Sequence, residues 1–404
     1  MTRRFVGTCL IVAALAVDVL ACYQLAAATG ARNDFFPRWL GTQLWLTEGA
    51  NLYGNAVDES IRSAIGTVPL GAEGEPFVFG FVYPAYVALL LAPLAVLPYS
   101  LAATLWLLGV QASILGGAYC CWRAIEREQH LPAVNALPAL VGATVFPGAV
   151  FTLLFLQFSA LVFLGVAASW WLAAAGHRRW AGAVLALAGI KPTLALLPVL
   201  GLVIGVGRSR AVVAGVALAI LASLLAASLF LLPGWPAGFL RSTTAYAAVA
   251  HPKSAASLIR AVLGLGDATA LVLALSLLVA ALIAAGWRAA PRSGASSLQA
   301  GVLAGAWLAP PLYEWNNVML LIVLLPAVRL GWARGRRTAV ACWCAFASLS
   351  TVTYALYLMR PSEARLVWPV LALAIYLAPL VSRALGRCGA TALPPAVSSP
   401  ATRM

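Results

Sequence analysis

Long apolar runs recur along the whole chain, and they limit the folds that it can adopt. The first run, residues 5–28, contains a single charged residue, Asp18. Of all 404 residues, 63% are hydrophobic and only 9% are charged. No soluble core could hide so much apolar surface, whereas about 20 apolar residues suffice for a helix to span a bilayer. The sequence therefore predicts an all-α polytopic membrane protein, formed as a single integral membrane domain over residues 1–404.

Basic residues cluster in short loops between the apolar runs, and they predict the orientation of the chain. The clusters lie at Arg3-Arg4, Arg178-Arg179, Arg208/Arg210, Arg288/Arg292, Arg329/Arg334/Arg336/Arg337 and Arg383/Arg387. By the positive-inside rule these loops face the cytoplasm, and the other loops lie outside. The formal net charge of +14 is therefore a topology signal and not a sign of nucleic-acid binding. We expect a multi-pass protein of the cytoplasmic (inner) membrane whose first run is retained as a span.

The apolar runs predict about twelve transmembrane helices. They lie near residues 5–28, 100–122, 133–151, 157–176, 180–190, 192–206, 211–232, 268–287, 298–310, 316–329, 338–358 and 366–383. A further stretch, residues 83–97, is short and bounded by prolines. If it crossed the membrane, Arg178 and Arg179 would lie outside, so we expect it to lie along or dip into the outer leaflet. The alternative is that residues 83–97 cross the membrane and that a later pair of short apolar segments does not.

Residues 29–82 form the first predicted outer loop, and their pattern predicts juxtamembrane helices. An amphipathic stretch, residues 35–48, is consistent with a helix lying on the membrane. A second short helix is expected over residues 58–65. Asp34 opens this polar segment and is followed by aromatic residues. A carboxylate in this place suggests chemistry at the outer face of the membrane.

Residues 233–267 form the second predicted outer loop, which is rich in cations and poor in acids. Its basic residues include Arg241, Lys253 and Arg260. The first outer loop thus offers carboxylates and the second offers positive charge. The C-terminal segment, residues 384–404, is expected to be a disordered cytoplasmic tail.

Charged residues inside a membrane are costly and often mark a pathway or a site. Lys191 is the clearest case, because it is one of only two lysines and it interrupts an apolar run just before Pro192. One interpretation is a lysine that extends its ammonium group to the interface from a helix end. The other, which we favour, is a cation in an outward-open cavity that binds an anionic headgroup.

Three other polar residues fall in or beside apolar segments. Glu314 is expected at the outer tip of a tight helical hairpin, where a solvated tip and a substrate contact are both open. Gln157 is expected near another outer tip, lining the cavity as a hydrogen-bonding group. We interpret Asp18 as a partnered structural acid in preference to a catalyst.

Motifs of soluble enzymes are missing from the sequence. It has no Walker loop, no dinucleotide-binding glycine pattern after a strand and no HExxH. The three histidines are scattered, and the seven cysteines lie in or beside apolar runs. The sequence therefore predicts no metal site, no cofactor and no disulfide framework.

A series of short motifs carries a resemblance to a known family. In order, these are Asp34 with its aromatic followers, residues 45–53, the block Phe81-Val82-Tyr83-Pro84-Ala85-Tyr86 continuing to Pro98, residues 180–193, and Leu308-Ala309-Pro310-Pro311 with Glu314-Trp315. Over roughly residues 30–330 the chain resembles glycosyltransferase family 87 of the GT-C superfamily. The block from Tyr83 to Pro98 is the most specific part of the resemblance.

The resemblance implies a polyprenyl-phosphate-sugar-dependent transferase, commonly a mannosyltransferase, that acts on the outer face of the cytoplasmic membrane. An acidic residue in the first outer loop serves as general base in this superfamily, and Asp34 matches that position. The family often has a second proline where this chain has Ala85. It often has a histidine where this chain has Asn316 and Asn317, which leaves open which substrate group is held there.

The residues themselves suggest the same chemistry. A lipid-linked donor leaves a phosphate behind, which cations near the membrane plane would stabilise. The available ones are Lys191, Arg241, Lys253 and Arg260. The hydroxyl of a lipid or glycan acceptor needs a base, for which we expect Asp34, with Asp58 and Glu59 as the alternatives. Tyr83, Gln157 and Glu314 complete the predicted substrate site, and direct in-line attack would invert the anomeric configuration.

Two other classes of protein remain open at this point. A lipid or sugar transporter or flippase would also combine many spans with embedded charge, but it predicts repeated halves with broken helices, and no convincing repeat is evident. A non-catalytic assembly subunit is the third class. The expected partners are the polyprenyl-phosphate-linked donor, the acceptor and membrane lipids, without nucleic acid.

Overall fold

The fold is all-α, as the sequence predicts. The computed structural model describes residues 3–65, 80–250, 259, 269–289, 293–308, 313–359 and 361–390, and within these ranges every regular element is a helix. The predicted membrane-surface stretch forms α2 (Phe35–Glu48), with the bounds that the sequence predicts. α3 (Asn55–Ile65) begins three residues before the expected second helix.

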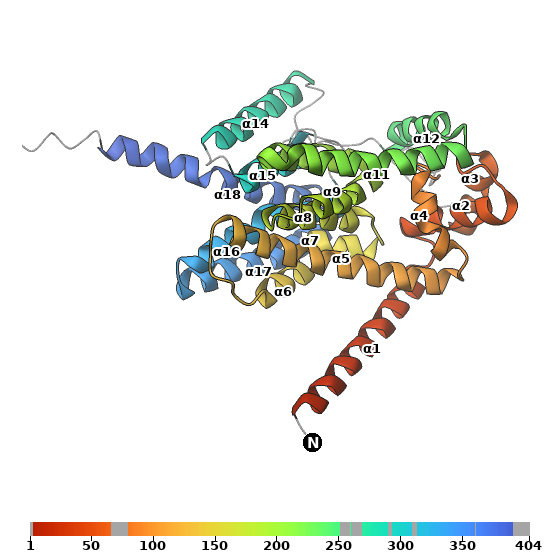
Figure 1. Ribbon diagram of the computed structural model, residues 1–404, viewed down its shortest axis with the longest axis horizontal. Coiled ribbons are helices and arrows are strands. Elements are labelled where there is room, and N and C mark those ends of the chain that lie inside the picture. Colours follow the sequence, from red (N-terminus) through yellow and green to blue (C-terminus); the bar gives the residue numbers. More distant parts are fainter. Residues whose placement is uncertain are drawn as a thin grey trace, which may run out of the picture.

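A single long helix, α5 (Tyr99–Glu128), runs through the centre of the molecule. Its 30 residues correspond to about 45 Å at the rise of an α-helix. Figure 1 shows α5 extending from the group formed by α2, α3 and α4 (Tyr86–Ala95) toward α16 (Leu321–Ala333). α1 (Arg3–Thr29) packs against α5 near its start and otherwise projects away from the other helices. The start of α5 and the end of α5 therefore define two ends of the molecule.

Helices on either side of α5 connect these two ends. α8 (Ser159–Ala174) packs along α5, and a hairpin of α9 (Arg178–Leu185), the 3-10 helix η1 (Ala186–Ile190) and α10 (Pro192–Gly205) packs against α8. At the far end of this hairpin, Gly205 approaches the backbone of Gly294, where α15 begins. The other helices are η2 (Gly207–Ser209), α11 (Arg210–Leu231), α12 (Trp235–Ala250), α14 (Thr269–Ala289), α15 (Gly294–Leu308), η3 (Glu314–Leu320), α17 (Arg336–Met359) and α18 (Pro361–Ala390).

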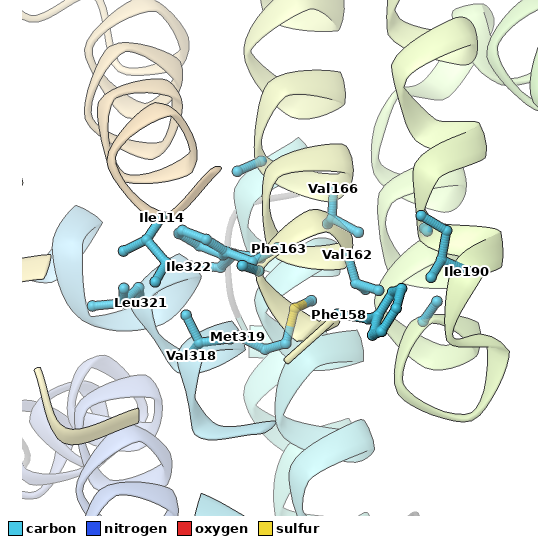
Figure 2. Packing of buried hydrophobic residues seen from close by; sticks show 14 of the residues in the cluster. Ile114, Phe158, Val162, Phe163, Val166, Ile190, Val318, Met319, Leu321 and Ile322 are labelled. Atoms are coloured by element: carbon cyan, nitrogen blue, oxygen red, sulfur yellow. The ribbon is translucent and has the colours of Figure 1, made fainter. Parts of the chain in front are cut away.

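Large aliphatic and aromatic side chains fill the space between these helices. Figure 2 shows Val162, Phe163 and Val166 of α8 packed between residues of α5, η1, η3 and α16. α5 and α8 approach closely because Gly117 leaves room for the ring of Phe163, which would lie only 2.4 Å from an added Cβ. An alanine at that position would force the Phe163 ring or one of the two helices to move.

Within the described part of the chain, four helices are long and apolar enough to cross a membrane. These are Tyr99–Glu128, Gly207–Leu231, Glu314–Ala333 and Arg336–Met359. A fifth is possible if α6 (Leu137–Val145) and α7 (Pro147–Leu154), which are bent by 62°, form one broken span. Several other predicted spans correspond to shorter apolar helices, and the count of about twelve stays a prediction. α4 has ten residues, about 15 Å, which is too short to cross a hydrocarbon core of about 30 Å.

The C-terminal segment differs from the expected disordered tail. α18 continues as a helix to Ala390, so residues 384–390 are helical. Residues 391–404 lie outside the described part of the chain. The helix continues through Gly386 and Gly389 in its last turns.

Candidate active site

Asp34 lies at the start of α2, where its neighbour Asn33 and not Asp34 itself caps the helix. The Oδ1 atom of Asn33 accepts hydrogen bonds from the backbone N–H groups of Phe35 and Phe36, each at 3.0 Å, and so caps the helix. Its Nδ2 group donates to the hydroxyl of Tyr99 at 2.7 Å, which ties the cap to α5. The Asp34 side chain makes no capping hydrogen bond. It is 24% exposed and available for other contacts.

Gln157 supplies the closest partner of that carboxylate. Its Nε2 group donates to Oδ2 of Asp34 at 2.6 Å, although the two residues are 123 positions apart. Gln157 lies in the turn between α7 and α8 and is almost fully buried. Before it, Leu156 has a φ of 50°, which is uncommon for a residue with a side chain. The indole N–H of Trp106 donates to the Leu156 carbonyl at 2.9 Å and holds the turn in place.

Lys191 approaches the same amide from the other side. Its Nζ group donates to Oε1 of Gln157 at 3.3 Å, to the hydroxyl of Ser159 at 3.2 Å and to Oδ1 of Asn316 at 3.2 Å. All three acceptors are neutral oxygens, and no carboxylate in the described residues forms an ion pair with Lys191. One amide therefore joins a carboxylate and a cation that do not pair directly. Lys191 is partly exposed, and its ammonium group is held by three protein oxygens.

Lys191 is placed here by a break in the helical hairpin. It has extended backbone angles, φ −132° and ψ 77°, between η1 and α10, as expected for a residue that precedes a proline. The hydroxyl of Tyr86 donates to the carbonyl of Gly189 at 2.6 Å and so fixes the segment just before the break. The ammonium group can reach the start of α8 because the backbone turns at this point.

The Tyr83–Tyr86 block connects the two sides of the site. Tyr86 holds the segment that precedes Lys191, as described above. The backbone carbonyl of Tyr83 accepts a hydrogen bond from the Tyr53 hydroxyl at 2.7 Å, and the ring of Tyr83 lies under the guanidinium of Arg38 at 4.8 Å. The part of the sequence that carries most of the family resemblance thus contacts Arg38, which lies beside Asp34, and Gly189, two residues before Lys191.

Arg38 is a site residue that the sequence analysis missed. Its Nη1 atom lies 3.5 Å from Oδ1 of Asp34, and its side chain is only 4% exposed. Its Nε and Nη1 atoms are buried without a hydrogen-bond partner among the described residues. Asp34 and Arg38 are four positions apart, which places both on one face of a helix, so this spacing was the available signal. The site therefore holds two cations beside one carboxylate.

Other predicted site residues lie elsewhere or outside the described residues. Glu314 is buried and forms an ion pair with Arg365 of α18 at 2.5 Å, so the solvated loop tip is wrong. Arg241 is exposed on α12, and no contact joins it to Asp34 or Lys191 in the described part of the chain. Lys253 and Arg260 lie outside that part.

The alternative bases, Asp58 and Glu59, and the acid of the first apolar run, Asp18, also lie in the described part of the chain. Asp58 is half-buried on α3, where its carboxylate faces the backbone of Gly80, and Glu59 beside it is exposed. Neither makes a contact with Gln157 in the structure's described ranges. Asp18 accepts a hydrogen bond from the Gln111 amide at 3.0 Å, as expected for a partnered acid.

Aromatic residues border the site next to Gln157. The Trp315 ring lies 5.0 Å from that of Phe155 and stacks on Tyr313 at 4.6 Å between ring centroids. The hydroxyl of Tyr313 is 3.4 Å from that of Tyr246 on α12. The second predicted outer loop therefore contributes a tyrosine to this region, in a place where the sequence suggested cations.

The comparison with known families assigns the chain. The profile of glycosyltransferase family 87 matches residues 81–312, which is more than half of the 404 residues. The chain belongs to this family and is a membrane glycosyltransferase. The matched stretch includes Tyr83, Gln157 and Lys191, begins after Asp34 and ends before Glu314. No curated protein and no solved structure matches the chain.

Proposed function

We propose that the protein transfers a hexose from a polyprenyl-phosphate sugar to a lipid or glycan acceptor, with mannose as the first candidate for the hexose. The reaction takes place on the outer face of the cytoplasmic membrane, at the end of the molecule where α2, α8 and α10 begin. Asp34 is the general base. Lys191 and Arg38 are the cations that receive the phosphate of the donor, and Tyr83 and Gln157 hold these groups in position.

The proposed reaction needs one proton acceptor and one anion site. The oxygen of the acceptor hydroxyl attacks the anomeric carbon, and its proton passes to the Asp34 carboxylate. The bond from the anomeric carbon to the phosphate oxygen breaks, and both electrons leave with the polyprenyl phosphate. The leaving phosphate gains negative charge, which a nearby ammonium or guanidinium group stabilises. Direct displacement inverts the anomeric configuration.

The observation that carries this proposal is the position of Gln157 between Asp34 and Lys191. If the ammonium and the carboxylate paired directly, each would neutralise the other. Because an amide separates them, the ammonium keeps its charge for an anion. Oδ2 of the carboxylate is taken by Gln157, and Oδ1 lies 3.5 Å from Nη1 of Arg38 without a hydrogen bond between them, so Oδ1 is the oxygen that can receive the acceptor proton. Family membership favours the transferase over a transporter, which would need no general base.

The experiment that tests the function uses the purified full chain with a panel of radiolabelled sugar donors and a membrane extract as the source of acceptors. We expect transfer from a polyprenyl-phosphate hexose and none from the corresponding nucleotide sugars. The anomeric configuration of the product should be opposite to that of the donor. Transfer from nucleotide sugars would contradict the proposal. Passage of the intact lipid donor across vesicles without any transfer would support a flippase instead.

A further inference from the structure

A pocket at the end of the molecule opposite Asp34 has no part in the proposed reaction. It is a cavity of about 660 Å³, open to the surroundings, near the end of α5 and the end of α8. We call it the Arg127 pocket, and the side chains that define it are Tyr119, Arg123, Glu126, Arg127, His130 and Trp171. It combines basic groups with large aromatic rings.

The only carboxylate of the pocket is already occupied. Oε1 of Glu126 accepts hydrogen bonds from Nε of Arg329 at 2.8 Å and from the backbone N–H of Val134 at 3.1 Å. Its Oε2 accepts from Nη1 of Arg123 at 2.7 Å. Both oxygens of Glu126 therefore already have donors, and neither is free to hold Arg127. Arg127 follows Glu126 directly and is exposed.

Arg127 is therefore a cation without an anion. Its guanidinium lies 5.9 Å from the ring centroid of Trp171, and no carboxylate among the described residues forms an ion pair with it. Arg123 lies 5.2 Å from the ring of Tyr119 in the same way. His130 adds another donor beside Arg127. An anion entering the pocket would meet positive charge that the protein does not already neutralise.

The length of α5 places this pocket at a membrane surface. Tyr99, which contacts the Asn33 cap next to Asp34, is 28 residues before Arg127 on the same helix. At 1.5 Å per residue this separation is about 42 Å. A bilayer with its headgroups is about 40–45 Å thick. If one end of α5 lies in one headgroup layer, the Arg127 pocket lies in the other, where tyrosine and tryptophan rings are also favoured.

We propose that the Arg127 pocket binds the phosphate group of an anionic phospholipid in the leaflet opposite Asp34. Arg127 and His130 contact the phosphate, and the rings of Tyr119 and Trp171 lie against the glycerol and the first acyl carbons. The aromatic and aliphatic part of the lining, including Leu131, favours a lipid over a free phosphate ion. The site does not depend on the proposed transfer reaction. Only its assignment to the cytoplasmic leaflet follows from the proposed orientation.

The chain offers a matched control at the same end of the molecule. Arg336 and Arg337 line a second open cavity of about 530 Å³ together with Val340 and Ala341, and it contains no aromatic ring. Arg127 and Arg337 are both exposed, so replacing either should leave the fold intact. If only general surface charge attracts anionic lipids, the two substitutions should have equal effects.

The test is a lipid titration of the purified full chain followed by native mass spectrometry. The probes are phosphatidylglycerol, phosphatidylcholine of the same acyl chains, and inorganic phosphate. We expect phosphatidylglycerol to bind more tightly than phosphatidylcholine. Arg127→Gln should weaken the binding of phosphatidylglycerol about fivefold, and Arg127→Glu should weaken it further. Arg337→Gln should leave it unchanged.

Three results would overturn the proposal. The first is equal affinity of the wild type for the two lipids. The second is equal loss of affinity in Arg127→Gln and Arg337→Gln, which would reduce the effect to surface charge. The third is competition by inorganic phosphate at concentrations comparable to those of the lipid, which would assign the pocket to a soluble anion. Transferase activity enters none of these readouts, so failure here is distinct from failure of the proposed reaction.

Discussion

Two regions of the molecule bring carboxylates and cations together, and they do so in different ways. Near the end of α5, Glu126 receives hydrogen bonds from Arg123, Arg329 and the Val134 backbone, and it is 4% exposed. Near the start of α8, Asp34 and Lys191 are joined only through the amide of Gln157, and Asp34 is 24% exposed.

The difference separates a structural ion-pair network from the proposed substrate site. A buried charge is tolerated when its partners compensate for lost hydration, as at Glu126. Lys191 has only neutral oxygen partners, so its charge is left for an anion that the protein itself does not supply. We therefore expect substitutions in the first region to change stability and substitutions in the second to change activity.

The largest expected effect is on stability and concerns the Glu126 network near the end of α5. Arg329→Met leaves the buried Glu126 carboxylate without its fully buried cationic partner, 2.8 Å away, and breaking a buried pair in this way costs about 3–5 kcal/mol. Denaturation of the purified protein in detergent should show this loss in the free energy of unfolding. Arg334→Met is the control, because Arg334 is exposed on the same segment. Equal stability of the two variants would remove the structural role of the network.

Asp34→Asn should reduce turnover by at least about 100-fold, since the side chain keeps its shape but can no longer accept the proton. Donor binding and the denaturation midpoint should stay nearly unchanged. Asp58→Asn is the matched control from the same predicted outer loop and should keep most of the activity. If Asp34→Asn retained more than about a tenth of the wild-type rate, Asp58 or Glu59 would become the better candidate for the base.

Lys191→Met should weaken binding of polyprenyl phosphate about tenfold or more, because a charge-assisted hydrogen bond contributes about 1.5–3 kcal/mol. Acceptor affinity should change little. Lys191→Arg keeps the charge and should recover part of the lost affinity. The measurement is a titration of each variant with the lipid phosphate alone. Unchanged affinity in Lys191→Met would show that the ammonium group serves only Gln157, Ser159 and Asn316.

The smallest expected effect concerns Asp58, outside both regions. Burial raises the pKa of Asp58 above its ordinary value of 3.8, and Arg62 opposes this shift. The folded state then binds more protons than the unfolded state, so stability falls as the pH rises from 3.8 through the raised pKa. Asp58→Asn should be slightly more stable than the wild type at neutral pH, and the two should converge in acid. The measurement is the denaturation midpoint of each protein as a function of pH. If the Asp58 carboxylate were stabilising, the wild type would be the more stable of the two at neutral pH.

Local features of the fold follow well from the sequence. The bounds of α2 and the existence of α3 depend on apolar spacing over a few turns, and both are visible in the residues alone. The break at Lys191 follows from the proline after it. The helical class follows from long apolar runs, since a helix satisfies its own backbone hydrogen bonds in lipid.

The arrangement of the site could not be predicted in the same way. Gln157 reaches Asp34 because Leu156 adopts a positive φ and Trp106 holds its carbonyl, and nothing in the local sequence specifies that turn. The partner of Glu314 is Arg365, 51 positions later on a different helix. The four-residue spacing from Asp34 could have identified Arg38 as a site residue. An arginine beside a membrane, however, is more often interpreted as a surface charge.

The most direct test of transfer at the outer face is to determine which side of the membrane each end of the molecule faces. Single cysteines at the exposed positions of Arg32, Glu48, Arg179 and Arg337, introduced into a cysteine-free variant, can be treated in whole cells with a membrane-impermeant thiol reagent. We expect labelling at positions 32 and 48 near Asp34, and none at positions 179 and 337 until the membrane is permeabilised. Labelling of positions 179 and 337 from outside, with positions 32 and 48 protected, would place Asp34 in the cytoplasm and contradict transfer at the outer face.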